Sequence, residues 1–434
     1  MLFPTVRFAV FYCLVLPANW LLMPRPLRWR LFVLGASFVF YAGWDWRYTG
    51  LLAASILVNQ VGANGIHRAA PHRRTRWLVA VLAVDLGLLA AYKYAGFLAD
   101  NATSLFDLVG LDWRLTAPGW VLPVGISFFT FQAISYVVDV HRRQLPPVGL
   151  LDFAVYLSFF PHLVAGPIVR AAEFLPQLRG RRDPKQVETS LGLWLIAVGL
   201  FKKVVVASYL AEEIVDPLFA FPGQHGGVEA LVGVYAYAIQ IYADFSGYTD
   251  MAIGLALLLG FRFPQNFDRP YSATSLQDFW RRWHMTLSRW LRDYLYIPLG
   301  GNQGGPTWRH LTLLLTMVLG GLWHGAAWHF VLWGAIHGAG LALERRWSER
   351  GGRAGGSLDP VEAAPGPGYG EVLVAEPVTV RRAAAPVRRP WRRRLVTFHV
   401  VCLAWVFFRA GSVGGAFDVL GRIAGGDAVN KVPD

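Results

Sequence analysis

Histidines set among apolar residues are the first candidates for chemistry in this sequence. His324 lies in the stretch Leu319–His329, which long apolar runs flank on both sides, and His337 follows a little later. An ionisable ring at the depth of a membrane is costly to keep, so it marks a site or a pathway by default. Glycines and alanines beside His324 allow another backbone or a substrate to approach closely. The alternative is a hydrogen-bonded histidine that only packs helices together.

A second histidine, His284, lies in a segment rich in arginine and tryptophan, Phe279–Tyr294. Neither His284 nor His324 is accompanied by a serine nucleophile elbow, a glycine-rich phosphate loop or a metal-ligand partner at helical spacing. His329 is five residues from His324, so the two face different sides of a helix, which argues against a metal site. An imidazole without a metal or nucleophile suits general-base chemistry. It can take the proton of a hydroxyl while that hydroxyl attacks an acyl carbon.

The composition is that of a polytopic membrane protein. Of the 434 residues, 54% are hydrophobic and 16% are charged, and the charges cluster between apolar runs. The net charge of +13 comes from arginines beside apolar segments. This pattern is typical of the positive-inside rule and of anionic lipid headgroups, and it argues against nucleic-acid binding. Cys13 and Cys402 lie in apolar runs and predict packing, with no disulfide framework and no metal site.

Apolar stretches long enough to cross a bilayer predict an all-α fold with about ten to twelve transmembrane helices in a cell membrane. The first stretch has no small-residue cleavage site, so we predict a retained span and not a removed signal peptide. The stretches fall roughly at residues 5–23, 31–45, 48–65, 77–97, 120–140, 188–209, 228–243, 247–262, 309–326, 328–344 and 395–409.

The positions of arginines orient these spans. The arginine-rich loops at residues 25–30 and 68–76 are separated by two spans, so both lie on one side, which we take as cytoplasmic. Residues 150–169 then carry arginines on both flanks that are expected to be cytoplasmic, although a full crossing would separate them. Pro161 and Gly166 interrupt this run. We therefore predict a re-entrant or broken segment, which is tolerated where it is buried in protein or lines a wet cavity.

Residues 262–308 differ in kind from the spans. After a turn-rich entry, residues 272–296 predict one amphipathic helix that lies in the membrane interface, with Ser275 as N-cap and Asp278 in the capping-box position. A membrane-surface anchor without chemistry is the alternative. Residues 346–394 are rich in proline, glycine and arginine and predict a poorly ordered cytoplasmic loop within a single domain of residues 1–434.

Several motifs occur in an order that resembles a known family. The motifs are Phe128–Gln132, Phe160–Ile168, Asp244–Gly254, Phe263–Phe267, Pro270–Tyr271, Asp278–Ser288, Tyr296–Asn302 and Gly321–Ala326. Together they resemble the membrane-bound O-acyltransferase family. Within it they resemble the bacterial branch that contains alginate O-acetyltransferase membrane subunits, peptidoglycan-acetylating relatives and D-alanyl transfer proteins of teichoic acid modification.

This resemblance implies a ring of transmembrane helices around a thinned centre, where a tunnel meets the active site from both faces of the membrane. It implies that His324, in the Trp-His-Gly motif, is catalytic, and that His284 is the second functional position. The donor would be an acyl thioester, as acyl-CoA or on an acyl-carrier protein, that approaches from the cytoplasm. No bound cofactor is implied. The acceptor would be a hydroxyl of an exported polysaccharide or another envelope polymer, and acetyl is the expected acyl group.

Four further residues are candidates for substrate binding or support of the histidines. Asn266 and Asp278 could position groups or stabilise charge, and Trp283 and Trp323 flank the two histidines in the sequence. A developing oxyanion needs hydrogen-bond donors. Asn266, Trp323 and nearby backbone amides are candidates that the sequence does not rank.

Near its end the sequence departs from the family pattern. Members of the family usually continue through further apolar segments beyond a motif that corresponds to Trp405–Arg409, whereas this sequence stops at Asp434. Residues 411–426 are only weakly apolar. Either the chain is naturally short or its end is missing, and the number of final spans stays open.

Two other functions remain as alternatives. A transporter or flippase could pass acyl groups or a glycan across the membrane without making a bond, since transporters also use broken helices at mid-depth. A relay subunit could instead hand the acyl group to a separate extracytoplasmic acetyltransferase partner. Covalent transfer from a labelled thioester to a hydroxyl would separate a transferase from a transporter.

Overall fold

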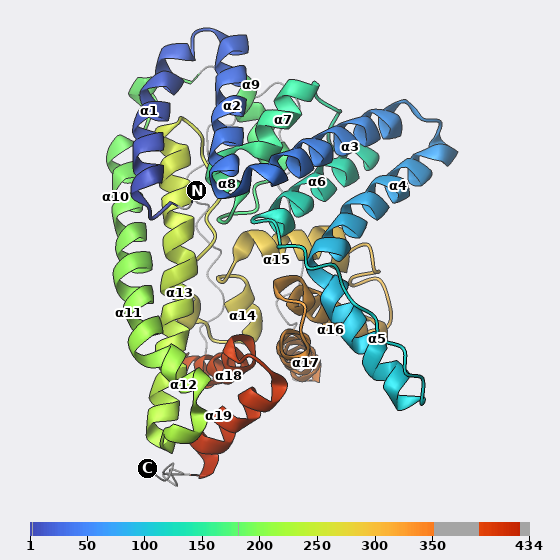
Figure 1. Cartoon of the computed structure of the whole chain (residues 1–434), viewed down its shortest axis with the longest axis vertical. Coiled ribbons are helices and arrows are strands. Elements are labelled where there is room, and N and C mark those ends of the chain that lie inside the picture. The colour runs from blue at the N-terminus through green and yellow to red at the C-terminus, as the bar shows by residue number, and fades with distance from the viewer. Residues whose placement is uncertain (2, 181, 351–389, 426–434) are drawn as a thin grey trace. The chain divides into compact units, whose positions relative to one another are not determined.

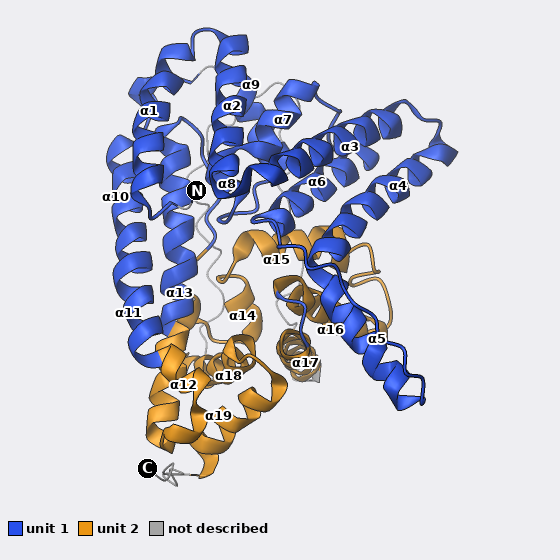
Figure 2. Cartoon of the chain, viewed as in Figure 1, with its two compact units in different colours: residues 1–214, 239–266, 325–327 blue, residues 215–238, 267–324, 328–434 orange. Residues whose placement is uncertain are grey.

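The computed structural model describes residues 1, 3–180, 182–350 and 390–425, and in these ranges all regular elements are helical. The prediction of an all-α protein is thereby confirmed. The chain divides into two compact units, which Figure 2 shows in two colours. Most of the predicted basic loop lies outside the described residues. Its two ends, residues 346–350 and 390–394, instead extend the helices α17 (Trp328–Arg350) and α18 (Pro390–Arg409).

Unit 1 comprises residues 1–214, 239–266 and 325–327. Its helices, labelled in Figure 1, are α1 (Val6–Leu22), α2 (Pro26–Asp45), α3 (Thr49–Arg68), α4 (Pro71–Leu89), α5 (Ala95–Leu108), α6 (Ile126–His141), α7 (Leu150–Ser158), α8 (Phe160–Leu163), α9 (Ala171–Arg179), α10 (Thr189–Leu200) and α11 (Ser208–Leu210). Among the described residues, two continuous stretches are long and apolar enough to cross a membrane, Pro71–Leu108 and Thr189–Ala220, and the second ends within unit 2. Single π-helical turns join α4 to α5 and α10 to α11 without ending either stretch.

One long helix, α13 (Gly227–Leu258), replaces two predicted spans at residues 228–243 and 247–262. The prediction of two spans was wrong, because the polar, glycine-containing stretch between them continues the helix without a break. Gly247 and Gly254 instead permit close packing. A Cβ atom on Gly254 would lie 2.6 Å from the carbonyl oxygen of Gly192, and one on Gly247 would lie 2.7 Å from that of Gly199. These small residues bring α13 against α10 backbone to backbone.

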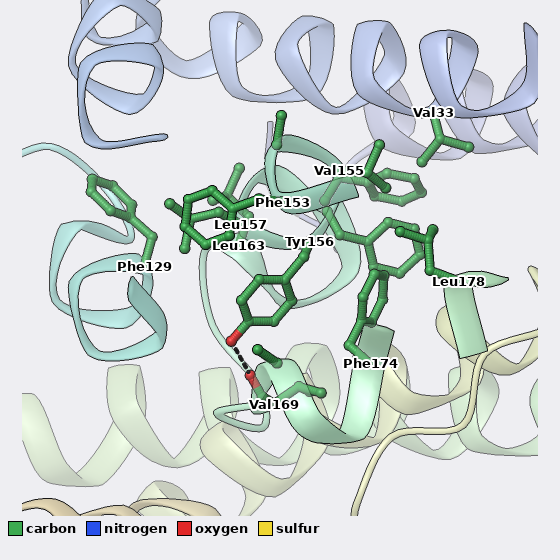
Figure 3. Packing of buried hydrophobic residues seen from close by; sticks show 14 of the residues in the cluster. Val33, Phe129, Phe153, Val155, Tyr156, Leu157, Leu163, Val169, Phe174 and Leu178 are labelled. Atoms are coloured by element: carbon green, nitrogen blue, oxygen red, sulfur yellow. Dashed lines mark hydrogen bonds between the residues drawn. The ribbon is translucent and has the colours of Figure 1, made fainter. Parts of the chain in front are cut away.

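The broken segment predicted at residues 150–169 is confirmed. α7 ends at Ser158, the four-residue α8 follows Phe159, and the chain then runs without regular structure to α9. The Tyr156 hydroxyl donates to the Val169 carbonyl at 3.0 Å, so the second half of the segment folds back on the first (Figure 3). Asp152 also lies 3.6 Å from Arg179 at the end of α9. The chain thus returns to the end of unit 1 from which it entered, which is the path of a re-entrant segment.

Buried aromatic and aliphatic side chains from α2, α6, α7 and α9 surround this segment. Phe153 and Tyr156 are fully buried, and Phe174 and Leu178 of α9 belong to the same buried cluster as Val33 of α2 (Figure 3). Irregular backbone at membrane depth has to be satisfied inside the protein. The packing of three helices around α7 and α8 meets that condition.

Unit 2 comprises residues 215–238, 267–324 and 328–434. Besides α17 and α18, and part of α13, its helices are α12 (Asp216–Ala220), α14 (Leu276–Trp280), α15 (Met285–Leu291), α16 (Pro306–His324) and α19 (Val413–Gly425). The weakly apolar residues near 411–426 therefore form a helix, α19, of 13 residues.

The single helix predicted for residues 272–296 is wrong. α14 ends at Trp280, and α15 begins only after His284, whose φ of 42° is left-handed and breaks the helix. Ser275 is the N-cap as predicted, since its Oγ accepts from the Asp278 amide at 3.0 Å. The Asp278 carboxylate accepts from the amide of Thr274, so the capping box is shifted by one residue.

The tryptophans of this segment face the protein interior. Trp280, Trp283 and Trp290 are all buried. A helix that served only to anchor the protein at a membrane surface would expose its aromatic side chains to lipid. The burial therefore argues against the surface-anchor alternative and gives residues 276–296 a place in the core of unit 2.

Candidate active site

The break between α16 and α17 positions His324. His324 is the last residue of α16, and α17 begins four residues later at Trp328. A Cβ atom on Gly321 would clash with the carbonyl oxygen of Phe330, and one on Gly334 would clash with that of Met317. Because these glycines have no side chain, the two helices pack backbone to backbone. His324 is thereby held against the first turns of α17.

The structure brings His324, His284 and Trp323 together. The His324 ring is half-buried, and its centroid lies 4.9 Å from that of Trp323 and 5.3 Å from that of Trp333. His284 is only 1% exposed, and its ring lies 6.3 Å from Trp323. His324 is therefore the histidine that a substrate can reach, whereas His284 lies behind it in the protein.

The surroundings of His284 keep it neutral. It lies between α14 and α15, two short helices that do not cross a membrane. Burial, and then the nearby His324, lower the pKa of His284 well below its ordinary value of 6.5. A neutral His284 adds no positive charge beside His324. It therefore does not oppose the arrival of a proton on His324.

An aromatic cluster, defined here as Trp280, Trp333, His337, Trp405 and Phe408, packs beside His324. Its rings lie within 5 to 6 Å of their neighbours, and Phe408 lies 5.1 Å from His324. Trp280 Nε1 donates to His337 Nδ1 at 3.3 Å, which places the proton of the neutral His337 ring on Nε2.

Three N–H groups in this cluster are buried without a hydrogen-bond partner among the residues that the structure describes. They are Trp333 Nε1, Trp405 Nε1 and His337 Nε2. An unsatisfied buried donor costs about 1–3 kcal/mol, so each such group calls for an explanation. These residues were not among the predicted site residues. The available signal was the spacing of Trp333 and His337, which are four residues apart and share a helix face.

The remaining predicted residues have other surroundings. Trp283 contacts the aromatic cluster, since its ring lies 5.0 Å from that of Trp405. Asp278 is engaged in local structure, where its carboxylate accepts from Arg282 Nε at 2.8 Å and from a backbone amide. Asn266 belongs to unit 1, where it is fully buried and its Nδ2 lies 3.5 Å from Thr249 Oγ1. Within unit 2 the structure therefore places Trp283 in the packing around the aromatic cluster, whereas Asp278 contacts Arg282 and the backbone.

The described part of the chain contains no group of three or more His, Cys, Asp or Glu residues that could hold a metal ion. Two hollows of about 470 and 520 Å³ occur in unit 2, one beside α19 and one beside the start of α16. Neither is lined by His324 or His284. The site is accordingly defined by its side chains, and these hollows do not identify it.

The chain belongs to the membrane-bound O-acyltransferase family, whose sequence pattern matches residues 126–350. The match includes both His284 and His324. It confirms the resemblance drawn from the motifs and makes the protein a membrane-bound O-acyltransferase enzyme.

Individual relatives place the chain within a bacterial branch of the family. It is 40% identical over 399 residues to a probable alginate O-acetylase AlgI of Azotobacter vinelandii. The aligned region covers 90% of this chain and 72% of that protein. It is 35% identical over 436 residues to a peptidoglycan O-acetyltransferase of Helicobacter pylori, and the aligned region covers 94% of this chain and 76% of that protein. A teichoic acid D-alanyltransferase of Streptococcus thermophilus is 30% identical over 236 residues, with 52% and 57% covered.

Proposed function

We propose that this multi-pass enzyme transfers an acetyl group from a cytoplasmic thioester donor to a hydroxyl of an exported polysaccharide or another envelope polymer. The observation that carries the proposal is the accessible His324 ring, held beside a neutral His284 at a helix break. The relatives named alginate O-acetylase and peptidoglycan O-acetyltransferase support acetyl as the acyl group and a polymer as the acceptor. The donor is acyl-CoA or an acyl-carrier protein.

In the proposed reaction His324 is the general base. It takes the proton of the acceptor hydroxyl while the hydroxyl oxygen attacks the carbonyl carbon of the thioester. The tetrahedral intermediate then collapses, the C–S bond breaks, and the proton passes from His324 to the departing thiolate. His284 is the buried neutral partner that supports His324, because two protonated rings so close together would repel each other.

The unsatisfied N–H groups of the aromatic cluster suit the needs of the carbonyl oxygen. A donor fixed before the reaction stabilises a developing oxyanion more than water does, because it needs no reorganisation. Trp333 and Trp405 carry such donors. Both rings contact Phe408, and Phe408 in turn contacts His324. We propose these indoles as candidates for binding the acyl oxygen. Because both side chains are only 1% exposed, the thioester has to displace neighbouring rings to reach them.

The decisive experiment measures whether the acetyl group of a labelled thioester becomes covalently attached to the acceptor. Purified protein in lipid nanodiscs is given acetyl-CoA and a polysaccharide fragment, and esters on the acceptor are measured by mass spectrometry. The proposal predicts ester formation by the wild type and its loss in His324→Ala at unchanged folding, judged by thermal stability and gel filtration.

Other outcomes assign other functions. Movement of unreacted acetyl groups or glycan across the membrane of sealed vesicles that contain the protein, with no ester formed, would identify a transporter and overturn the proposal. Ester formation that requires an added extracytoplasmic acetyltransferase would identify one half of a relay. In that case His324→Ala should still block release of free CoA, because the first transfer takes place in this chain.

A further inference from the structure

Two arginines share one carboxylate where α2, α7 and α9 meet in unit 1 (Figure 1). Arg30 Nε lies 3.2 Å from Asp152 Oδ1, and Arg179 Nε lies 3.6 Å from Asp152 Oδ2. The Asp152 side chain is only 12% exposed, so these pairs are partly withdrawn from solvent. One negative charge cannot balance two positive charges, and the cluster begins with an excess of +1.

Arg182 adds a third guanidinium group beside this pair. Its central carbon lies 3.8 Å from the centroid of the Trp29 ring and 4.3 Å from that of Phe261. Both rings are buried, so the guanidinium is held between two aromatic faces. Arg182 Nε and Nη1 are buried and have no hydrogen-bond partner in the described residues. A buried guanidinium with unsatisfied donors is costly unless an anion is supplied.

The neighbouring charge makes this arrangement less favourable still. Burial, and then the charge of Arg30, lower the pKa of Arg182 to about 9, so that Arg182 remains a cation at neutral pH. Three arginines and one aspartate leave an excess charge of +2.

The other carboxylates on the adjoining segments are already engaged. Asp183 accepts from the Lys185 amide at 2.9 Å, and Glu173 accepts from the Arg170 amide at 3.1 Å. Neither hydrogen bond involves a side chain of the cluster. Among the described residues, Asp183 forms no ion pair with the three arginines and so does not act as a second counter-ion.

We propose that Arg30, Arg179 and Arg182 bind a phosphate group, and that Asp152 orients the first two. A phosphate dianion matches the excess charge, and the planar forks of guanidinium groups match its oxygens. Arg179 is 46% exposed and provides the open side of the site, whereas Arg182 forms its buried back. The arginines at residues 25–30 and 170–185 are expected to share the cytoplasmic side, so the ligand is expected to come from there.

Two sources of phosphate fit this chemistry. One is the headgroup of an anionic phospholipid, and the other is a phosphate of a nucleotide-bearing acyl donor. Only the second source rests on the proposed function. Binding is measured without any acyl transfer, so failure of the site and failure of the proposed reaction can be told apart.

The test uses the full chain in a phosphate-free maltoside detergent. One arm titrates coenzyme A, with pantetheine as its phosphate-free match. The other arm titrates dioleoylphosphatidylglycerol, with dioleoylglycerol as its match. Binding is followed by native mass spectrometry and by tryptophan fluorescence, since Trp29 contacts Arg182.

The critical variant is Arg182→Gln, and Arg114→Gln is the matched control on an exposed arginine. We expect at least a tenfold loss of affinity for one phosphate-bearing probe in Arg182→Gln and none in the control. Arg182→Lys keeps the charge but loses the planar fork, so it should fall between the two. The arm that responds identifies the source of the phosphate.

Two results would overturn the site. The first is equal binding of each phosphate-bearing probe and its phosphate-free match to the wild type, or equal binding to Arg182→Gln and Arg114→Gln. The second is a marked loss of thermal stability in Arg182→Gln without any probe, with no change in phosphate binding. That result would make Arg182 a packing residue. The proposal expects the variant without probe to be at least as stable as the wild type.

Discussion

His162 and His324 both lie beside a helix interruption in an apolar stretch, yet their surroundings differ. His162, in α8 of unit 1, is fully buried, and its Nε2 lies 2.8 Å from the Tyr156 carbonyl oxygen. Its ring stacks on Phe263 at 5.3 Å. His324 in unit 2 is half-buried and has a second histidine, His284, close enough to affect its charge. An intramembrane histidine can thus be a packing residue or a site, and access to its ring separates the two.

The sharpest way to break this comparison is to remove each ring in turn. His324→Ala should lower the acyl-transfer rate by about 10²- to 10⁴-fold, the range of a lost general base, with little change in melting temperature. His162→Ala should instead cost about 3 kcal/mol of stability, because it opens a cavity among aromatic rings. Rates in nanodiscs and thermal melts measure both effects. If His162→Ala lost as much activity as His324→Ala at equal stability, the distinction would fail.

The close packing of α16 and α17 should be the next most sensitive feature. Gly321→Ala puts a methyl group into the Phe330 carbonyl and forces the helices apart, which displaces His324 from Trp333. We expect about a hundredfold loss of rate, since small misplacements of a reacting group are costly. Gly87→Ala, in α4, meets nothing within 4 Å and serves as the control. That control should keep its activity and gain slightly in stability.

The role of His284 should be seen more clearly in the pH dependence of stability than in the transfer rate. Its folded pKa lies below that of the unfolded chain, so below about pH 6.5 the unfolded chain binds a proton that the folded protein does not. Stability is therefore lost as pH falls through this range, by at most about 1.4 kcal/mol per pH unit. In His284→Gln this part of the slope should disappear. Thermal melts between pH 7.5 and 5.5 would show it, and an unchanged slope would mean that His284 titrates normally.

The smallest effect should come from the fold-back of the re-entrant segment. Tyr156→Phe removes the hydroxyl that donates to the Val169 carbonyl but keeps the ring. We expect a loss of about 1 kcal/mol in stability and an unchanged transfer rate, because the site lies in other residues. Chemical denaturation in detergent and the nanodisc assay would measure the two quantities. A large loss of rate would show that unit 1 contributes to catalysis through this segment.

The sequence by itself determined the helical class and the family, and it singled out His284 and His324 as candidate site residues. Apolar runs separated by arginines are enough to predict the helical class, because a membrane requires helices whose backbone hydrogen bonds are formed internally. The Trp-His-Gly and Arg-Arg-Trp-His motifs were enough to indicate the family and to single out the two candidate histidines. The break at Pro161 and Gly166 was also visible, since proline and glycine interrupt helices for local steric reasons.

Only the tertiary structure decided which neighbours each of these residues has. The left-handed backbone of His284 splits a segment that was predicted as one helix, and α13 runs as one helix through two predicted spans, with Gly247 and Gly254 packed against α10. Trp333 and Trp405, distant in sequence, meet beside His324, while Asp278 turns to Arg282. Local sequence signals indicate the propensity of a segment to form a helix and the residues, such as proline and glycine, that interrupt one. Contacts between distant segments depend on how whole helices pack, and these contacts decide whether a histidine in an apolar stretch is enclosed, like His162, or partly accessible, like His324.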